Sequence, residues 1–342
     1  MTDLNTKLEI FDAIATRRNE RRSFLRFAGG SAIALGGATL LSACGSDDSD
    51  LAPSPTPSPT PTAALNDADV LNFALNLEYL EAQFYAYAAF GVGLNASLLT
   101  GTGTQGGVTG GAQVPFSDTV VREYAREIAI DEVAHVAFLR SALGTAAVAQ
   151  PALDISAGTA AAPGAFTSAA RAAGVIGATG VFNPYADDNS FLLGAYIFED
   201  VGVSAYKGAS PLIANKTYLE AAAGILAAEA YHAGLIRTIL FRKGLTTPSL
   251  VTGANQISDA RDSLDGTVTN TSTGVIGDDD QGITGSDATM SNIVPTDANG
   301  LAYSRSTGQV LNIVYLNKTA VSMGGFFPAG VNGNIKTSAA NA

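Results

Sequence analysis

Ile130-Asp131-Glu132-Val133-Ala134-His135 is the stretch that decides the fold, and a shorter copy of it stands at Glu229-Ala230-Tyr231-His232. The chain has only two histidines, and each lies three residues after a glutamate. Residues at i and i+3 share one face of a helix, so each pair can direct a carboxylate and an imidazole at the same ligand. Arg140 and Arg237 each follow their histidine by five residues, which indicates an internal duplication.

Two further glutamates occupy matching positions in the two halves of the chain. Glu78 and Glu199 are each followed seven residues later by a tyrosine, Tyr85 and Tyr206 respectively. A dimetal site in a bundle core needs one glutamate from each of two helices that face the Glu-x-x-His helices. Glu78 and Glu199 meet this requirement.

Glu81 is an alternative to Glu78, one helical turn further on. Its counterpart in the second half is Gly202, so we expect Glu81 outside the ligand set or at the surface. Carboxylates and imidazoles suit iron or manganese better than structural zinc, which favours cysteine and histidine. Four carboxylates also balance the charge of two divalent ions. The sequence therefore predicts two iron ions, with two manganese ions as the alternative, and six ligands: Glu78, Glu132, His135, Glu199, Glu229 and His232.

The order Glu, Glu-x-x-His, Glu, Glu-x-x-His resembles the ferritin-like superfamily, and residues 130–140 resemble the second helix of bacterioferritins. The wider chain is similar to the ferritin-like group that includes desiccation-related proteins, through residues 186–192 and 294–301. This resemblance implies an all-α four-helix bundle with a long crossover between its second and third helices (the B–C crossover). It implies no established common reaction.

Helical periodicity, caps and glycine stops place the bundle in residues 65–245. Its expected helices are 67–90, 117–144, 190–209 and 217–243, the last one opened by a capping box of Thr217 and Glu220. Residues 145–188 supply the long crossover. Residues 246–342 are expected to be an irregular extension that wraps the bundle, with residues 310–316 as a buried strand or extended segment. Asp278-Asp279-Asp280 lacks the spacing of a calcium loop and is interpreted as a solvated turn.

The first 64 residues have the features of an export signal and a tether. Residues 1–44 hold the twin-arginine sequence Arg21-Arg22-Ser23-Phe24-Leu25-Arg26 and the lipobox-like Leu41-Ser42-Ala43-Cys44. Because Cys44 is the only cysteine, we expect its lipidation; an ordinary cleaved signal with a spare cysteine is the alternative. Residues 45–64 alternate proline with serine or threonine and form a semi-rigid spacer. The expected location is the periplasmic side of the cell envelope, with a lipid anchor in the membrane.

Composition limits the partners. The formal net charge of −12 argues against nucleic acid. The preferred interpretation is a redox enzyme that reduces dioxygen or disproportionates peroxide in stress protection. A structural stress protein with a metal-free or incidentally metallated site is the alternative, and iron storage in a closed cage is a weaker one. A homo-oligomer is left open.

Five residues near the expected ligands are given secondary roles. Tyr85 and Tyr206 are expected as core residues beside the ligands. Asp131 either orients a histidine ring from outside the ligand set or faces solvent. Arg140 and Arg237 are expected as charge partners near the end of the bundle.

Overall fold

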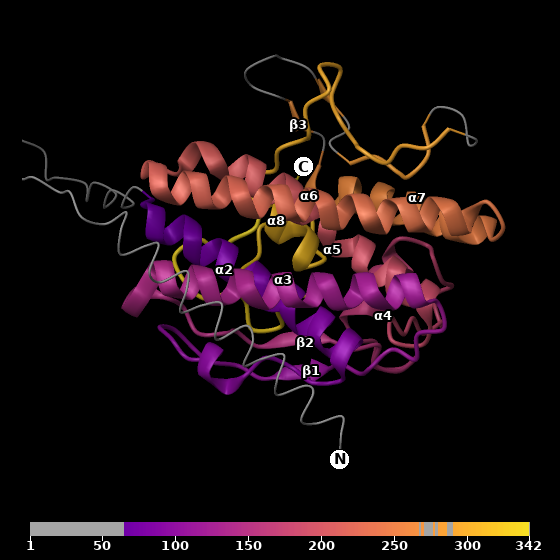
Figure 1. Ribbon diagram of the computed structural model, residues 1–342, viewed down its shortest axis with the longest axis horizontal. Helices are drawn as coiled ribbons and strands as arrows, with labels where there is room; N and C mark the ends of the chain where they lie inside the picture. The colour runs from indigo at the N-terminus through magenta and orange to yellow at the C-terminus, as the bar shows by residue number, and fades with distance from the viewer. Residues whose placement is uncertain (1–64, 267, 270–275, 278–279, 286–289, 342) are drawn as a thin grey trace, which may run out of the picture. The chain divides into compact units, whose positions relative to one another are not determined.

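The computed structural model describes residues 65–266, 268–269, 276–277, 280–285 and 290–341 (Figure 1). The expected signal (1–44, with Cys44) and tether (45–64) lie outside the described residues. In the part of the chain that is described, no helix has the length and apolar character needed to span a membrane.

Four long helices form the bundle, and they run alongside one another (Figure 1). They are α2 (Asp67–Phe90), α3 (Thr119–Leu143), α5 (Asp188–Ala209) and α6 (Lys216–Gly244). The most extensive packing joins α2 to α3 and α5 to α6, and the two pairs meet where α2 contacts α5 and α3 contacts α6. The expected all-α bundle is therefore confirmed, and the long connection from α3 to α5 is the predicted crossover.

The helix ends follow their capping side chains. Asn66 and Asp69 form a capping box at the start of α2. In α3 the Asp118 side chain accepts hydrogen bonds from the amides of Val120 and Val121, so this helix begins two residues later than expected. The capping box predicted at Thr217 is wrong. Asn215 caps α6 by accepting from the Thr217 amide, and asparagine satisfies a free helix N–H as well as threonine does.

Short elements fill the connections. The α2–α3 connection contains the 3₁₀ turn η1 (Ala96–Leu98) and strand β1 (Val108–Gly110), and β1 pairs in parallel with β2 (Leu153–Ile155) of the crossover. The crossover also holds η2 (Gly144–Ala146) and α4 (Ala165–Ala172), and η3 (Ser210–Leu212) links α5 to α6. A second two-stranded ladder is antiparallel and consists of β3 (Val268–Thr269) and β4 (Ile276–Gly277).

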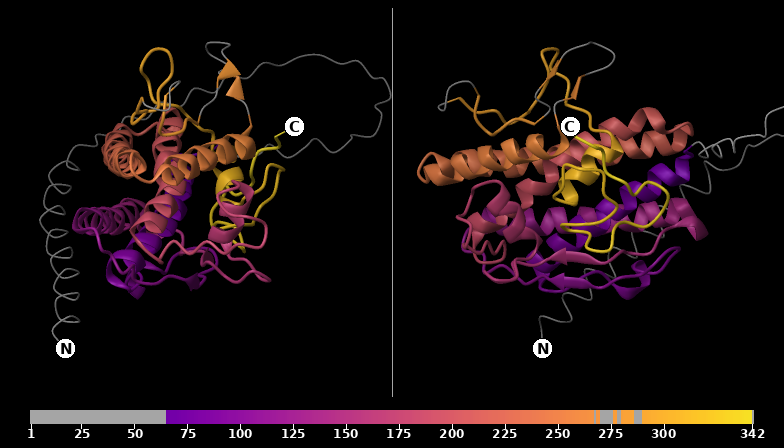
Figure 2. Two further views of the ribbon diagram at one scale, coloured as in Figure 1. Left: turned by 90° about the vertical axis from the view of Figure 1, so that its right-hand side faces the viewer. Right: turned by 180° about the vertical axis from the view of Figure 1, so that it is seen from behind.

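The C-terminal segment is less irregular than expected. It begins with α7 (Pro248–Asp265), which packs against α5 and α6. The strand expected at 310–316 is wrong, because α8 (Thr307–Val314) forms there from a capping box of Ser306 and Gln309. Packing on the bundle is as expected: the Asn332 amide donates to the side chain of Asn76 at 2.9 Å. The segment around α8 covers the α2–α5 side of the bundle (Figure 2).

A cluster of aromatic rings makes this segment part of the core. Phe84 of α2 lies 5.3 Å from Phe166 of α4 and 5.6 Å from Phe198 of α5, measured between ring centroids. Phe326, from the C-terminal segment, lies 4.9 Å from Phe198 and is fully buried. Burying one such side chain stabilises a fold by about 1.5–3 kcal/mol. The crossover and the C-terminal segment therefore hold the bundle together from outside its four helices.

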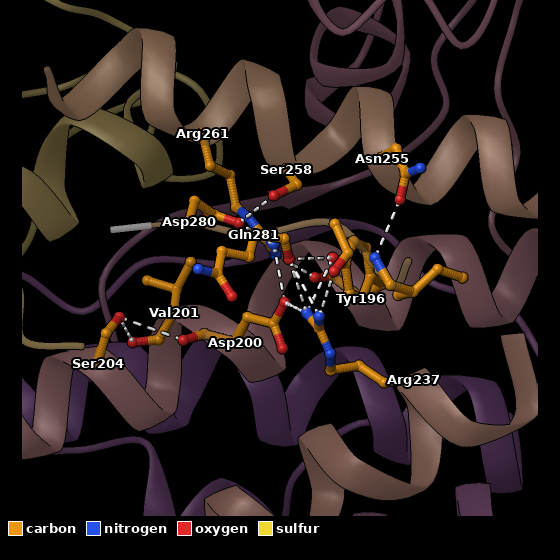
Figure 3. Close-up of polar contacts among 12 residues, drawn as sticks. Tyr196, Asp200, Val201, Ser204, Arg237, Asn255, Ser258, Arg261, Asp280 and Gln281 are labelled. Atoms are coloured by element: carbon orange, nitrogen blue, oxygen red, sulfur yellow. Dashed lines mark hydrogen bonds and ion pairs between the residues drawn. The ribbon is translucent and has the colours of Figure 1, made fainter. Parts of the chain in front are cut away.

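Buried ion pairs join α5 and α6 to α7 and to the residues that follow it (Figure 3). Asp200 of α5 accepts from Arg237 of α6 at 2.7 Å and from Arg261 of α7 at 2.8 Å. Asp280 accepts from Arg261 at 2.7 Å and from Arg305 at 2.8 Å. The solvated turn is therefore wrong for Asp280, which is 6% exposed, because two guanidinium groups draw it inside. The two residues before it lie outside the described part of the chain.

Candidate metal centre

The six predicted ligands meet in the interior of the bundle. Glu78 comes from α2, Glu132 and His135 from α3, Glu199 from α5, and Glu229 and His232 from α6. All four carboxylates are at most 1% exposed. Each Glu-x-x-His pair lies on one helix face, as its spacing requires. Ligand atoms lie within 4.8 Å of one another in two groups, one from Glu78, Glu132, His135 and Glu229, the other from Glu199, Glu229 and His232.

Distances show that the site has two halves. The Nδ1 atom of His135 lies 3.2 Å from Glu78 Oε2 and 3.6 Å from Glu132 Oε2. The Nδ1 atom of His232 lies 3.0 Å from Glu132 Oε1 and 3.7 Å from Glu199 Oε2. Glu132 thus directs one oxygen toward each histidine, and Glu229 is the member common to both groups. The two rings are 6.2 Å apart between centroids.

Two tyrosines hold the glutamates in a crossed arrangement. The Tyr85 hydroxyl of α2 donates to Oε1 of Glu199 on α5, and the Tyr206 hydroxyl of α5 donates to Oε1 of Glu78 on α2. Each tyrosine therefore holds the glutamate of the opposite half, not the glutamate that lies two turns away on its own helix. Both rings lie in the core, as expected, and both hydroxyls contact the ligand set. Each bond leaves the other carboxylate oxygen facing the site.

Asp131 has both of the roles that the sequence left open. Its side chain is 46% exposed, yet its Oδ2 lies 3.3 Å from Nε2 of His232. In the tautomer that donates this hydrogen bond, the proton is on Nε2 of His232, and the lone pair of Nδ1 is directed into the site. Outer carboxylates of this kind fix the ring orientation of histidine ligands.

Whether these residues suit a metal can be judged from eight of their buried atoms that make no hydrogen bond in the described part of the chain. Burying an unpaired polar atom costs about 1–3 kcal/mol, so a cluster of them is expensive unless a cation satisfies it. All six predicted ligands contribute at least one such atom, and these residues therefore fit a pair of cations. Within the described residues the eight atoms make no hydrogen bond: Glu78 Oε2, Glu132 Oε1 and Oε2, His135 Nδ1, Glu199 Oε2, Glu229 Oε1 and Oε2, and His232 Nδ1.

The electrostatics of the cluster support the same fit. Burial raises the pKa of Glu78 to about 7, against the lowering effect of His135. Burial likewise raises the pKa of Glu199 to about 8, against His232. Although burial acts to raise the pKa of Glu132, the two histidines hold it well below its usual range. Glu78 and Glu199 therefore retain protons near neutral pH unless a cation replaces them, and metal binding is expected to release protons.

The expectation for Glu81 is wrong about the surface, since this residue is buried at 6% exposure. Gly202 was the reason to exclude it, and Gly202 proves to lie against the site. A Cβ atom there would stand 2.3 Å from Glu229 Oε2 and 3.6 Å from Glu81 Oε1. The glycine thus marks space that the site uses, which the sequence pattern alone did not reveal.

The two duplicated arginines have different surroundings. Arg140 donates to the Tyr79 hydroxyl and to the Thr100 carbonyl, each at 2.6 Å, and stays partly exposed. Arg237 is fully buried and pairs with Asp200, the residue after the ligand Glu199. The expected charge pairing is confirmed for Arg237, whereas Arg140 makes no ion pair within the described residues. The other contacts of Arg237 are the Tyr196 hydroxyl of α5 and backbone carbonyls of residues 281, 282 and 292, and no spacing along the chain indicated them.

Four helices that direct four glutamates and two histidines into one core define a ferritin-like bundle. The family described as "Ferritin-like domain" matches residues 66–242. The chain therefore belongs to the ferritin-like family.

Two relatives match most of the chain. The "Ferritin-like catalase Nec2" of Nesocodon mauritianus is 29% identical over 280 residues, which cover 79% of this chain and 84% of that protein. The "Desiccation-related protein PCC13-62" of Craterostigma plantagineum is 31% identical over 276 residues, covering 78% of this chain and 83% of that protein. No solved structure matches the chain significantly. The resemblance to the desiccation-related group is confirmed.

Proposed function

We propose that this protein is a dimetal carboxylate enzyme that disproportionates hydrogen peroxide in stress protection. The observation that carries the proposal is the convergence, from four helices, of eight buried carboxylate and imidazole atoms that make no hydrogen bond to the described residues. Reduction of dioxygen is the other reaction expected of such a centre. The relative that is named a catalase favours peroxide.

The two halves of the site suggest how two iron ions, or two manganese ions, would be held. Glu78 and His135 would bind one ion, and Glu199 and His232 the other. Glu132 and Glu229 would be shared, since the first faces both histidines and the second belongs to both groups. Redox-active ions bound there would supply the two-electron chemistry that turns two H₂O₂ into two H₂O and one O₂.

The chain's own residues would orient and shield this chemistry. Tyr85 and Tyr206 restrain the two terminal carboxylates, and Asp131 restrains the ring of His232. Fully buried apolar side chains adjoin these residues in the chain and limit the entry of water: Phe84 precedes Tyr85, and Val136 follows His135. Exclusion of water strengthens the electrostatic interactions inside the site.

The test is metal content together with oxygen evolution by the full chain. The wild type should bind about two equivalents of iron or manganese per chain and release O₂ from H₂O₂. A variant carrying both His135→Ala and His232→Ala should lose both properties. Glu220→Gln, at an exposed position on α6, is the control and should keep both. Full metal content in the double histidine variant would contradict the proposed site.

A second candidate is a structural stress protein, and the relative named a desiccation-related protein favours it. In that case the tyrosine–glutamate hydrogen bonds would hold a metal-free polar core. A chelator would leave the melting temperature unchanged and the wild type would not consume peroxide. Glu78→Gln and Glu199→Gln would then be neutral or stabilising, because glutamine never takes on the buried charge that each glutamate acquires when it loses its proton.

We also propose that the bundle acts outside the cytoplasm. A twin-arginine signal in residues 1–44 would direct export, lipidated Cys44 would anchor the chain, and residues 45–64 would hold the bundle away from the membrane. Twin-arginine export carries folded proteins, so the metal could be loaded before export.

A further inference from the structure

Glu81 is a buried carboxylate without a hydrogen-bond partner. It is 6% exposed, and none of the hydrogen bonds or ion pairs within the described residues includes its carboxylate. It lies on α2 three residues after Glu78, so the two side chains share one face of the helix and point to the same interior. Such a carboxyl group either keeps its proton or is charged beside a cation that compensates the cost of burial.

Gly202 on α5 provides the space beside it. A Cβ atom at this position would stand 2.3 Å from Glu229 Oε2, closer than real Cβ contacts occur, and 3.6 Å from Glu81 Oε1. The carboxylates of Glu81 and Glu229 therefore border the same space, which any larger residue at position 202 would fill.

A small cavity lies beside Glu81 and Gly202. Glu81, Gly202 and Tyr206 line it together with apolar side chains, among them Leu77 and Phe326. It has room for about one water-sized molecule. The Tyr206 hydroxyl already donates to Glu78, and the other walls are apolar, so the polar side of Glu81 is the one that faces Glu229.

We propose that Glu81 is a seventh metal-binding side chain, which binds an iron or manganese ion beside Glu229 in the space that Gly202 leaves open. This inference rests on the proposed dimetal function. Four carboxylates already balance two divalent ions, so a fifth adds a negative charge that strengthens cation binding. It also makes the two metal positions unequal, because the second half has glycine where the first has Glu81.

The experiment is a titration of the metal-free full chain with Mn²⁺, comparing the wild type with Glu81→Gln. Glutamine keeps the shape and removes the charge. Both proteins should bind two ions, and in the variant one of them should be bound about tenfold or more weakly. X-ray absorption of the loaded variant should show fewer oxygen and nitrogen donors per metal. Glu127→Gln, at an exposed position on α3, is the control and should match the wild type.

A purely structural Glu81 gives the opposite pattern. Glu81→Gln would then change the melting temperature of the metal-free protein and leave the Mn²⁺ affinity and the donor number at wild-type values, which overturns the inference. If Glu81→Gln does not fold, Glu81→Asp replaces it, and wild-type affinity in that shorter carboxylate has the same meaning. A wild type that binds no Mn²⁺ and no Fe²⁺ overturns the proposed function itself, and the inference with it.

Discussion

Single residues decide whether the centre presents its ligand atoms correctly. Tyr85 and Tyr206 each use a hydroxyl to hold a glutamate of the other half, and each bond fixes which oxygen remains for a metal. The matching of Glu and Tyr at seven-residue spacing was visible in the sequence. The crossing of the pairs was not, because it depends on how α2 and α5 lie against each other.

Tyr206→Phe should weaken metal binding while the bundle stays folded. The lost hydroxyl leaves Glu78 free to rotate away from the site, and such changes typically cost 10–100-fold in metal affinity. Tyr185→Phe is the matched control, since this buried hydroxyl donates to the Ile155 carbonyl at 3.0 Å instead of to a ligand. Both variants should lose about 0.5–1.5 kcal/mol of stability. Equal Mn²⁺ affinities in the two variants would show that Tyr206 does not position Glu78.

At the scale of elements, the bundle depends on segments that follow it in the chain. Arg261 of α7 and Asp280 reach α5 and α6 through Asp200 and Arg237 (Figure 3). Arg305 is a second partner of Asp280. Although burial acts to raise it, Arg261 and Arg305 hold the pKa of Asp280 below its ordinary value of 3.8. A group with a lowered pKa stabilises the fold above the unfolded-state pKa, and this contribution is lost as pH falls through the folded value.

Asp280→Asn should therefore destabilise the protein at pH 7 by about 3–5 kcal/mol, because it leaves two buried guanidinium groups with less negative charge. The difference from wild type should shrink below about pH 4, where the aspartate of the unfolded wild type begins to take up a proton, and it should vanish as pH falls through the lower pKa of the folded state. Urea unfolding at pH 7 and at pH 3 measures both effects. Asp259→Asn, at an exposed position on α7, the helix that carries Arg261, should change neither. A difference that stays constant across this pH range would show that the charge of Asp280 is not what stabilises the contact.

At the scale of the whole molecule, the proposed lipid anchor at Cys44 would hold the protein at a membrane. If Cys44 carries the lipid anchor, Cys44→Ala should move the protein from the membrane fraction to the soluble fraction or leave it uncleaved, because acyl chains supply the membrane affinity. Fractionation of the native host, followed by mass spectrometry of the intact protein, measures this. An unmodified Cys44 in the native protein would contradict the lipid anchor, and the proposed metal centre would be unaffected.

The sequence by itself determined the bundle and its six inward ligands. Periodicity and caps act within a few residues of chain, and Glu132 with His135, or Glu229 with His232, share a helix face for the same local reason. The ends of α2 were predictable from Asn66 and Gly91, since caps are local as well. The duplication then supplied Glu78 and Glu199.

Only the tertiary structure decided the contacts between residues distant in the chain. The surface position allowed for Glu81 was wrong because the environment of this residue depends on Gly202 of another helix. A glycine has no side chain, so it leaves no pattern in the sequence to detect. Asp280 was misplaced because its partners Arg261 and Arg305 come from separate segments. The helix α8 formed where a strand was expected, because a short apolar run suits either structure. Burial and charge pairing are properties of the packed molecule, and no local stretch of the chain specifies them.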